Sequence, residues 1–308
     1  MNKLVVKDNS LIDASFNLSV IEQRLMLLAI VEARELKNLT SETAIEVKAI
    51  TYKDQYKVDE SEAYKQLREA GKTLKRREFT YLDKYKGIDV YSTVNWVNKI
   101  TYVPTKGMIV LKLSTEVIEL VSRLEANFTQ YLLEQVSEFK SKYSIRLYEL
   151  LAKWIKLEQT EKYELSDLRN KLGILENEYK SVAYLKRDVL DKAVKEINEK
   201  SDLDVKYNQF KVGRNITHIQ FKIKTKATST KIKKPKALKP LTQKQIDMFS
   251  DKLARSPKFQ NYYLADEGKG IEEYKHKIAL NLQDSYYVKA WMEYLVEVGY
   301  KKSVDSCC

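Results

Sequence analysis

Hydrophobic and polar positions between residues 179 and 225 change their period once, and this change predicts a helix followed by a β-hairpin. The first apolar residues recur at three- and four-residue spacing, which points one stripe of a helix into a core: Val182, Leu185, Val189, Ala193 and Ile197. Later apolar residues alternate with polar ones, as in half-buried strands: Leu203, Val205, Tyr207, Ile219, Phe221 and Ile223. Residues 211–215 connect the two strands and include Gly213, where a tight turn needs a positive φ.

The polar face of this helix and the tip of the hairpin both carry cations. At about 100° per residue, one arc of the helix holds five polar side chains: Tyr184, Arg187, Asp188, Asp191 and Lys195. Lys211 and Arg214 flank the turn glycine. This is the outline of a winged helix, which lays its helix in the DNA major groove and its wing along the backbone. The pattern alone also fits an ordinary α+β domain with solvated lysines.

The distribution of charge favours the first interpretation. Between residues 200 and 245 there are 13 Lys or Arg and 2 Asp, a net charge of +11, whereas the whole chain of 308 residues carries +12. The excess is therefore local, as expected of a segment that binds a polyanion.

The preceding chain predicts the same order of elements once more. Ser19 and Glu22 form a capping box before a helical pattern that starts at Ile21. The pattern then predicts a strand, two helices and three further strands, the first two of these joined across Lys86-Gly87: residues 45–47, 52–58, 61–77, 79–82, 90–100 and 108–113.

The second half begins with a helix at 144–157, a strand at 163–165 and a helix at 166–172, which a Ser-Asp cap opens and Gly173 ends. A shift of 123 residues superposes six apolar positions of the two halves, which with the repeated order favours two related domains. We expect a helix-rich α+β fold with two tandem winged-helix domains at 1–125 and 126–225. The chain continues with a basic, proline-containing linker at 226–241 and a helical appendage at 242–308. The sequence indicates no role for this appendage.

The sequence shows no motif for a cofactor site or a catalytic centre. Gly71-Lys72-Thr73 imitates the end of a phosphate-binding loop, but it lies inside a predicted helix. The two histidines, His218 and His276, are isolated, and the two cysteines are the last two residues. We therefore expect no metal site, no cofactor, no disulfide and no enzymatic activity. No apolar run approaches the ~20 residues of a membrane span, and residues 1–8 lack the apolar core expected of a signal peptide. We therefore expect a cytoplasmic protein with no membrane partner.

Five segments, in order, resemble the iteron-binding replication initiators of bacterial plasmids, the RepA/RepB/RepE type: residues 5–12 (VVKDNSLI, with Val5 first), 18–25, 143–151 (YSIRLYELL), 190–198 and 202–221. The resemblance covers residues 4 to 225. It implies two winged helices, of which the second reads the iterons and the first adds DNA backbone contacts and a dimer interface. Monomers of such initiators bind origin iterons, melt AT-rich DNA with the host replication initiator and load the host helicase, whereas their dimers repress their own promoter at an operator inverted repeat.

Carried onto this chain, the resemblance implies a base-reading helix that begins near Lys180 and a wing that holds phosphates. Arg146 either contacts DNA or braces its helix, and Lys186 has no assigned role. The expected DNA-binding residues are Lys180, Ser181, Tyr184, Arg187, Lys195, Lys211, Arg214, Arg146, Lys72, Lys75 and Arg76. Two alternatives stay open, namely a winged-helix transcriptional repressor without a replication role and a basic structural or RNA-binding protein.

Overall fold

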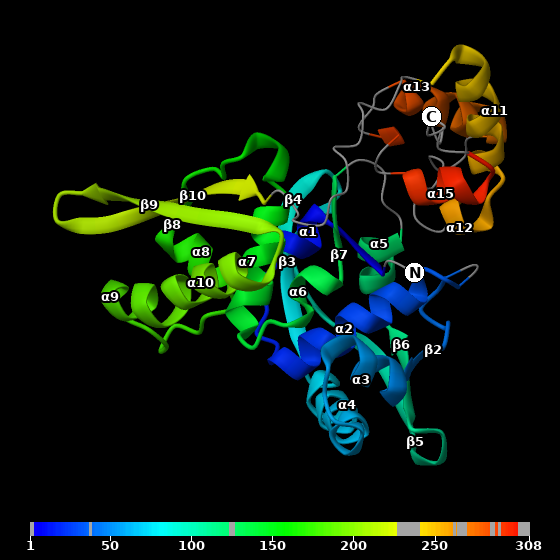
Figure 1. Cartoon of the computed structure of the whole chain (residues 1–308). Helices are drawn as coiled ribbons and strands as arrows, with labels where there is room; N and C mark the ends of the chain where they lie inside the picture. The colour runs from blue at the N-terminus through cyan, green and yellow to red at the C-terminus, as the bar shows by residue number, and fades with distance from the viewer. Residues whose placement is uncertain are drawn as a thin grey trace, which may run out of the picture. The chain divides into compact units, whose positions relative to one another are not determined.

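The computed structural model describes residues 3–36, 39–122, 127–226, 241–260, 263, 270–283, 287–288 and 291–300. The chain forms two compact units. The first contains residues 1–33, 40–121 and 126–227, and the second contains residues 34–39, 122–125 and 228–308. The first unit holds two winged helices, and the second is helical (Figure 1).

The first winged helix follows the predicted order, and its three strands form an antiparallel sheet in the order β2-β6-β5. The Ser19–Glu22 capping box is confirmed, because the Ser19 amide donates to Glu22 Oε2 at 2.6 Å and the Glu22 amide donates to Ser19 Oγ at 3.3 Å. The elements are α2 (Val20–Ala33), β2 (Ile45–Lys48), α3 (Ala49–Tyr56), α4 (Glu60–Leu74), β5 (Val97–Val103) and β6 (Met108–Leu113).

The second winged helix repeats this topology. Its sheet has the order β8-β10-β9. As in the first winged helix, the strand that comes last in the chain lies in the centre of the sheet and pairs with both others. The predicted duplication of the fold is therefore confirmed. The elements are α7 (Lys142–Ala152), β8 (Tyr163–Glu164), α8 (Leu165–Lys171), α9 (Val182–Leu185), α10 (Asp191–Lys200), β9 (Leu203–Val212) and β10 (Asn215–Thr225).

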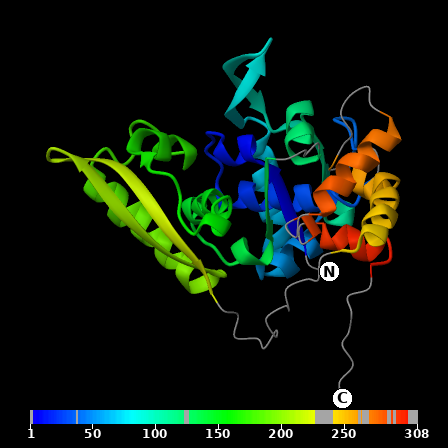
Figure 2. The same cartoon turned by 90° about the horizontal axis from the view of Figure 1, so that it is seen from above.

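One predicted strand is wrong, because residues 90–100 form two strands in different sheets. β3 (Glu78–Tyr85) and β4 (Ile88–Asn95) form a hairpin inserted between α4 and β5, and this hairpin projects from the first winged helix (Figure 2). Trp96 separates β4 from β5 and is 1% exposed. Its ring packs 4.6 Å from the ring of Phe79 and 4.9 Å from that of Phe16, and this anchoring of Trp96 in the core interrupts the strand.

Several short elements were not predicted. β1 (Leu4–Asp8) pairs antiparallel with β7 (Phe128–Leu132), so a strand of the expected first domain pairs with a strand from just beyond its expected end. The other additions are α1 (Asn9–Asp13), α5 (Thr115–Ser122) and α6 (Glu134–Ser137).

The turn at Gly173 confirms the predicted end of α8. Gly173 has a φ of +68°, and a Cβ placed on it would lie 1.9 Å from the Phe16 carbonyl oxygen, so glycine is required. The predicted Ser-Asp cap is wrong, because β8 runs directly into the helix and the N-cap residue is Glu164.

The second unit contains α11 (Gln243–Ala254), α12 (Pro257–Gln260), α13 (Ile271–Leu282) and α15 (Met292–Glu297). Thr242 and Gln245 form a capping box at the start of α11. The ring of Phe259 lies 5.0 Å from that of Trp291 and 5.3 Å from that of Tyr294, which gives this unit an aromatic core. Most of the expected basic linker, residues 227–240, and the terminal Cys307 and Cys308 lie outside the described residues.

Candidate nucleic-acid interface

The helix beside the hairpin is not a regular α-helix. Between α9 and α10 the backbone forms a π-helical turn, Lys186–Leu190. The buried stripe explains it: Leu185, Val189, Ala193 and Ile197 recur every four residues, and such a stripe drifts by about 40° per step around an α-helix. A wider turn reduces this drift and keeps all four side chains in the core. Single π turns are frequent at functional sites.

The exposed face of this helix brings together three of the side chains that the sequence placed in one arc. Tyr184 is 54% exposed, and the Arg187 guanidinium lies over its ring, 4.9 Å from the centroid. Arg187 donates to both carboxylate oxygens of Asp188, from Nη2 at 2.6 Å and from Nε at 3.1 Å. Lys192 Nζ also donates to Asp188, at 3.1 Å. These two cations lower the pKa of Asp188 to about 2, so the carboxylate is charged at neutral pH.

Contacts with β9 fix the position of the helix. Lys186 Nζ donates to Gln209 Oε1 at 2.9 Å, and the Tyr207 hydroxyl donates to Asp191 Oδ1 at 2.5 Å. Burial raises the pKa of Tyr207, and the bond to Asp191 raises it further. Lys186, which the sequence left without a role, therefore helps to tie the helix to the hairpin. An open groove lies between helix and strand, lined by these side chains and Phe210.

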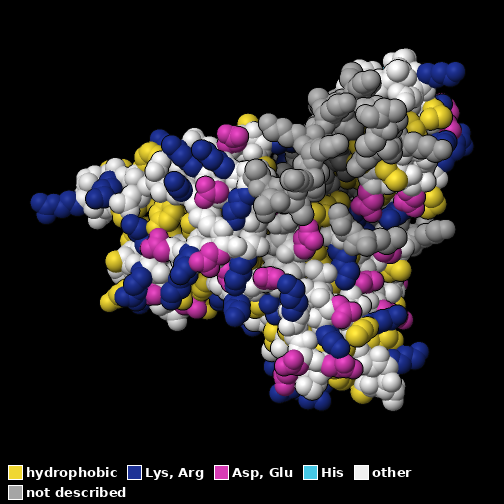
Figure 3. Space-filling view, in the orientation of Figure 1, with side chains coloured by type: hydrophobic (Ala, Val, Ile, Leu, Met, Phe, Trp, Pro, Cys, Tyr) yellow, Lys and Arg dark blue, Asp and Glu magenta, His cyan; other side chains and the backbone are white. Residues whose placement is uncertain are grey.

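The hairpin β9–β10 carries cations to its tip. Gly213 has a φ of +61°, which confirms the predicted turn, and Val212 pairs with Asn215 across it. Lys211 and Arg214 are exposed, and Figure 3 shows Lys and Arg side chains along the hairpin and below it. Lys162 lies 4.4 Å from the centroid of the Phe210 ring and adds a cation that sequence reasoning missed.

The other predicted positions of this domain are also on the surface. Lys180 and Ser181 are exposed just before α9, although the Ser181 side chain makes no capping bond. Lys195 is exposed on α10, with its Nζ 3.9 Å from Glu199 Oε1. These side chains are accessible to a ligand.

The first winged helix offers a second cationic groove, between α4 and β5. Lys72, Lys75 and Arg76 are exposed and line it. Lys72 Nζ lies 2.9 Å from Glu69 Oε1, and Lys75 donates to the Val97 carbonyl at 3.3 Å. Lys99, which sequence reasoning missed, lines the same groove from β5. Lys99 reaches this groove because α4 packs beside β5, and no local pattern in the sequence predicts that packing.

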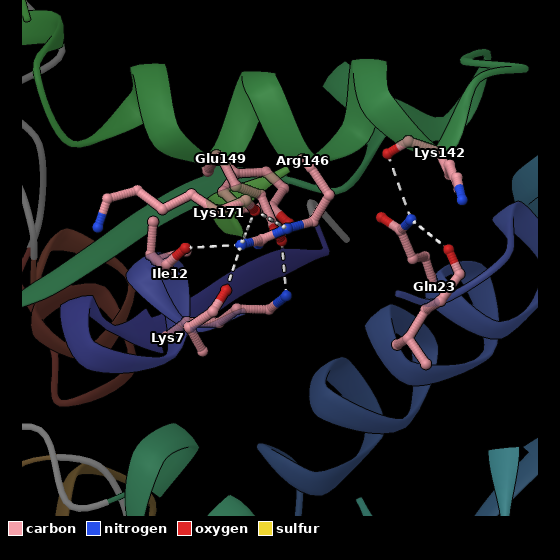
Figure 4. Close-up of polar contacts among 10 residues, drawn as sticks. Lys7, Ile12, Gln23, Lys142, Arg146, Glu149 and Lys171 are labelled. Carbon is pink, nitrogen blue, oxygen red and sulfur yellow. Dashed lines mark hydrogen bonds and ion pairs between the residues drawn. The ribbon is translucent and has the colours of Figure 1, made fainter. Parts of the chain in front are cut away.

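Arg146 is buried, which contradicts its inclusion among the DNA-binding residues and supports the alternative that it braces its helix. It is 1% exposed and donates to Glu149 Oε2 at 2.7 Å and to the carbonyls of Ile12 at 2.8 Å and Lys171 at 2.9 Å. Figure 4 shows this network with Lys7, whose Nζ lies 2.6 Å from Glu149 Oε1. Arg146 therefore braces α7 against the N-terminal segment.

Comparison with known families assigns both winged helices. Residues 4–152 match the model described as "Initiator Replication protein, WH1", and residues 164–223 match "Initiator Rep protein, WH2". The chain belongs to the initiator Rep family. The WH1 range contains the first winged helix and continues through α7, and the WH2 range runs from β8 into β10.

Relatives of the initiator include two named proteins of Escherichia coli. It is 25% identical to the PI protein in an alignment 233 positions long that covers 65% of this chain and 75% of that protein. It is 27% identical to a replication initiation protein in an alignment 210 positions long that covers 66% of this chain and 65% of that protein. The crystal structure of Pi initiator protein in complex with iteron DNA has the same fold, with a TM-score of 0.61 at 23% identity, covering 72% of this chain and 97% of that one.

The family assignment bears on the alternatives. A transcriptional repressor without a replication role is not favoured for a member of an initiator family, and the family is one of initiators rather than of known enzymes. Within the described ranges, no group of three or more His, Cys, Asp or Glu could hold a metal ion. The helices described for this initiator include none long and apolar enough to cross a membrane.

Proposed function

We propose that this initiator binds iteron DNA of a plasmid origin through its second winged helix. The helix at residues 182–200 enters the major groove, and the wing follows the phosphate backbone. The observation that carries this proposal is the exposed Tyr184–Arg187 face, which lies beside a hairpin whose tip bears Lys211 and Arg214. Support comes from the related Pi initiator, whose crystal structure is a complex with iteron DNA.

The first winged helix adds sequence-independent contacts to the same duplex. Lys72, Lys75 and Arg76 hold phosphates, together with Lys99 from the facing strand. α4 occupies the place in its domain that α9 and α10 occupy in theirs, so both domains present the equivalent surface to DNA. Phosphate contacts fix the register of a protein on the duplex, whereas base contacts specify the sequence.

Further partners follow from the family resemblance. The bound initiator melts an adjacent AT-rich segment with the host replication initiator and recruits the host helicase, without an enzymatic activity of its own. A monomer binds the iterons, a homodimer binds an operator inverted repeat, and the protein acts in the cytoplasm. The first domain supplies the dimer interface, and its proposed boundary with the second domain stays at residues 125 and 126.

Selection of bound duplexes from a randomised pool tests the DNA-binding part of this proposal. The full chain should enrich one sequence, and that sequence should recur as direct repeats near the gene. Affinities for the enriched and a scrambled duplex, measured at the same salt concentration, should differ by at least about a thousandfold, as for specific binders. Equal affinities would overturn sequence-specific binding.

A plasmid replication assay separates an initiator from a repressor. A plasmid that carries the gene and its flanking repeats should replicate only while the helix at residues 182–200 is intact. Replication that continues when this helix is disrupted would contradict the proposed role and favour a repressor.

A further inference from the structure

The Arg187 side chain contacts two neighbouring side chains on its own helix, Asp188 and Tyr184. Asp188 accepts from Nε and Nη2 in a side-on fork, with distances of 3.1 and 2.6 Å. The guanidinium carbon also lies over the Tyr184 ring, 4.9 Å from the ring centroid. The two bonds to the carboxylate orient the guanidinium, and the ring contact restricts it further. An exposed arginine on a helix otherwise samples many rotamers.

This arrangement leaves one edge of the guanidinium available. Arginine has five N–H donors, and Asp188 uses Nε–H and one hydrogen of Nη2. The remaining end-on edge presents one N–H from Nη1 and one from Nη2, side by side. Guanine is the base that presents two acceptors, N7 and O6, side by side in the major groove, and a bidentate arginine matches them.

The charge around Arg187 argues against a phosphate contact. Asp188 partly neutralises both Arg187 and Lys192, which makes this part of the helix a poor attractant for a polyanion. By contrast, at the wing tip the structure records no carboxylate partner for Lys211 or Arg214 among the described residues. A surface that only needed to hold phosphates would gain nothing from a carboxylate in its centre.

We propose that Arg187 reads a guanine of the DNA site through N7 and O6, and that Asp188 is the positioning residue that makes this contact selective. The inference rests on the proposed function and assigns a base to it. Asp188 raises selectivity in two ways: it holds the guanidinium edge toward the base, and its charge repels phosphates that would otherwise compete for the arginine.

Guanine analogues in the duplex test the base assignment. The probe is the duplex enriched from the randomised pool, in which each guanine in turn is replaced by 7-deazaguanine, which lacks the N7 acceptor but still pairs with cytosine. For the intact chain, one replacement should weaken binding by about tenfold, the order of magnitude of one specific arginine–guanine pair. The same replacement should cost Arg187→Ala nothing further. An equal decrease in both proteins at every position would overturn the guanine assignment.

Asp188→Asn tests the positioning role, because it keeps the shape of the side chain and removes its charge. Affinity for the enriched duplex should fall about tenfold while affinity for a scrambled duplex rises, and the 7-deazaguanine effect should shrink. Glu199→Gln is the matched control, an exposed carboxylate on the same helix that should strengthen binding to both duplexes alike. If Asp188→Asn behaves like Glu199→Gln, Asp188 acts only through net charge and the inference is wrong.

The two proposals fail in different ways. A wild-type chain that enriches no sequence would contradict the proposed function itself. A chain that enriches a sequence but has no guanine coupled to Arg187 would contradict only the inference. Thermal unfolding of each variant, with a melting temperature equal to that of the intact chain, shows that weaker binding does not come from an unfolded domain.

Discussion

The buried ion cluster around Glu149 holds the N-terminal strand to α7. Glu149 accepts from Lys7 at 2.6 Å, from Arg146 at 2.7 Å and from the Tyr131 hydroxyl at 2.7 Å. Burial alone would raise the pKa of Glu149, but the neighbouring cations and hydrogen bonds hold it below its usual value. Burial lowers the pKa of Lys7. One carboxylate is thus shared by two buried cations and partly compensates their charge.

Glu149→Gln should destabilise the fold by about 3–5 kcal/mol, because it leaves Lys7 and Arg146 buried without a counter-charge. Urea unfolding followed by circular dichroism measures the decrease in stability. Glu62→Gln is the control, since it removes an exposed carboxylate 3.2 Å from Lys65 and should cost at most about 1 kcal/mol. Similar decreases in the two variants would show that the buried cluster has no special role.

The same carboxylate should make stability sensitive to acid. The pKa of Glu149 is lower in the folded than in the unfolded chain, so the folded state binds fewer protons. Its contribution is complete above the unfolded pKa of about 4.3 and is lost as the pH falls toward the folded value. Between pH 6 and pH 3 the free energy of unfolding should therefore decline more steeply in the wild type than in Glu149→Gln. Parallel declines would assign the acid sensitivity to other groups.

At the scale of elements, we expect the wing to contact DNA phosphates only and so to carry no sequence information. Replacing Lys211 and Arg214 by Ala should weaken binding to specific and scrambled duplexes alike, because phosphate contacts are common to both. The slope of log K against log salt should flatten by about 0.9 for each phosphate that is no longer neutralised. Lys206→Ala provides a comparison on the same hairpin, nearer to the helix. An unchanged slope in the double variant would remove the wing from the DNA interface.

Element by element, periodicity predicted what depends on local sequence. The helix near residue 182 and the hairpin to residue 225 follow from apolar spacing, and Gly213 marks the turn. β1 was missed because its pairing with β7 joins residues that are at least 120 positions apart, which no local pattern encodes. The division between β4 and β5 depends on the packing of Trp96 against distant rings.

The proposed DNA-binding face was also predicted only as far as local sequence determines it. The exposure of Tyr184 and Arg187 follows from the helical period, but the fork to Asp188 depends on side-chain geometry. The π turn also escapes prediction, because ideal helical geometry assumes a constant number of residues per turn. The sequence left the role of Arg146 open, because arginine occurs both as a surface cation that binds DNA and as a buried residue that holds elements together. Its burial between α7 and the N-terminal segment decides the matter.

For the whole molecule, the duplicated winged helix sets how one chain can meet a repeated DNA site. In both domains the strand that comes last in the chain lies in the centre of the sheet. Both domains also place a helix beside a groove lined by lysines. We therefore expect one chain to contact two successive stretches of the same duplex. A homodimer has twofold symmetry, which matches an inverted repeat and does not match a direct repeat.

We therefore expect DNA to select the oligomer. A duplex with two direct repeats should bind one chain per repeat, whereas an inverted-repeat operator should bind a dimer, because pairing through the first domain restricts the orientation that a direct repeat requires. Light scattering of both complexes at matched protein concentrations measures the stoichiometry, and a scrambled duplex of equal length controls for unspecific loading. If both sites bind the same number of chains at every dilution, DNA symmetry does not select the oligomer and the protein behaves as an ordinary dimeric DNA-binding protein.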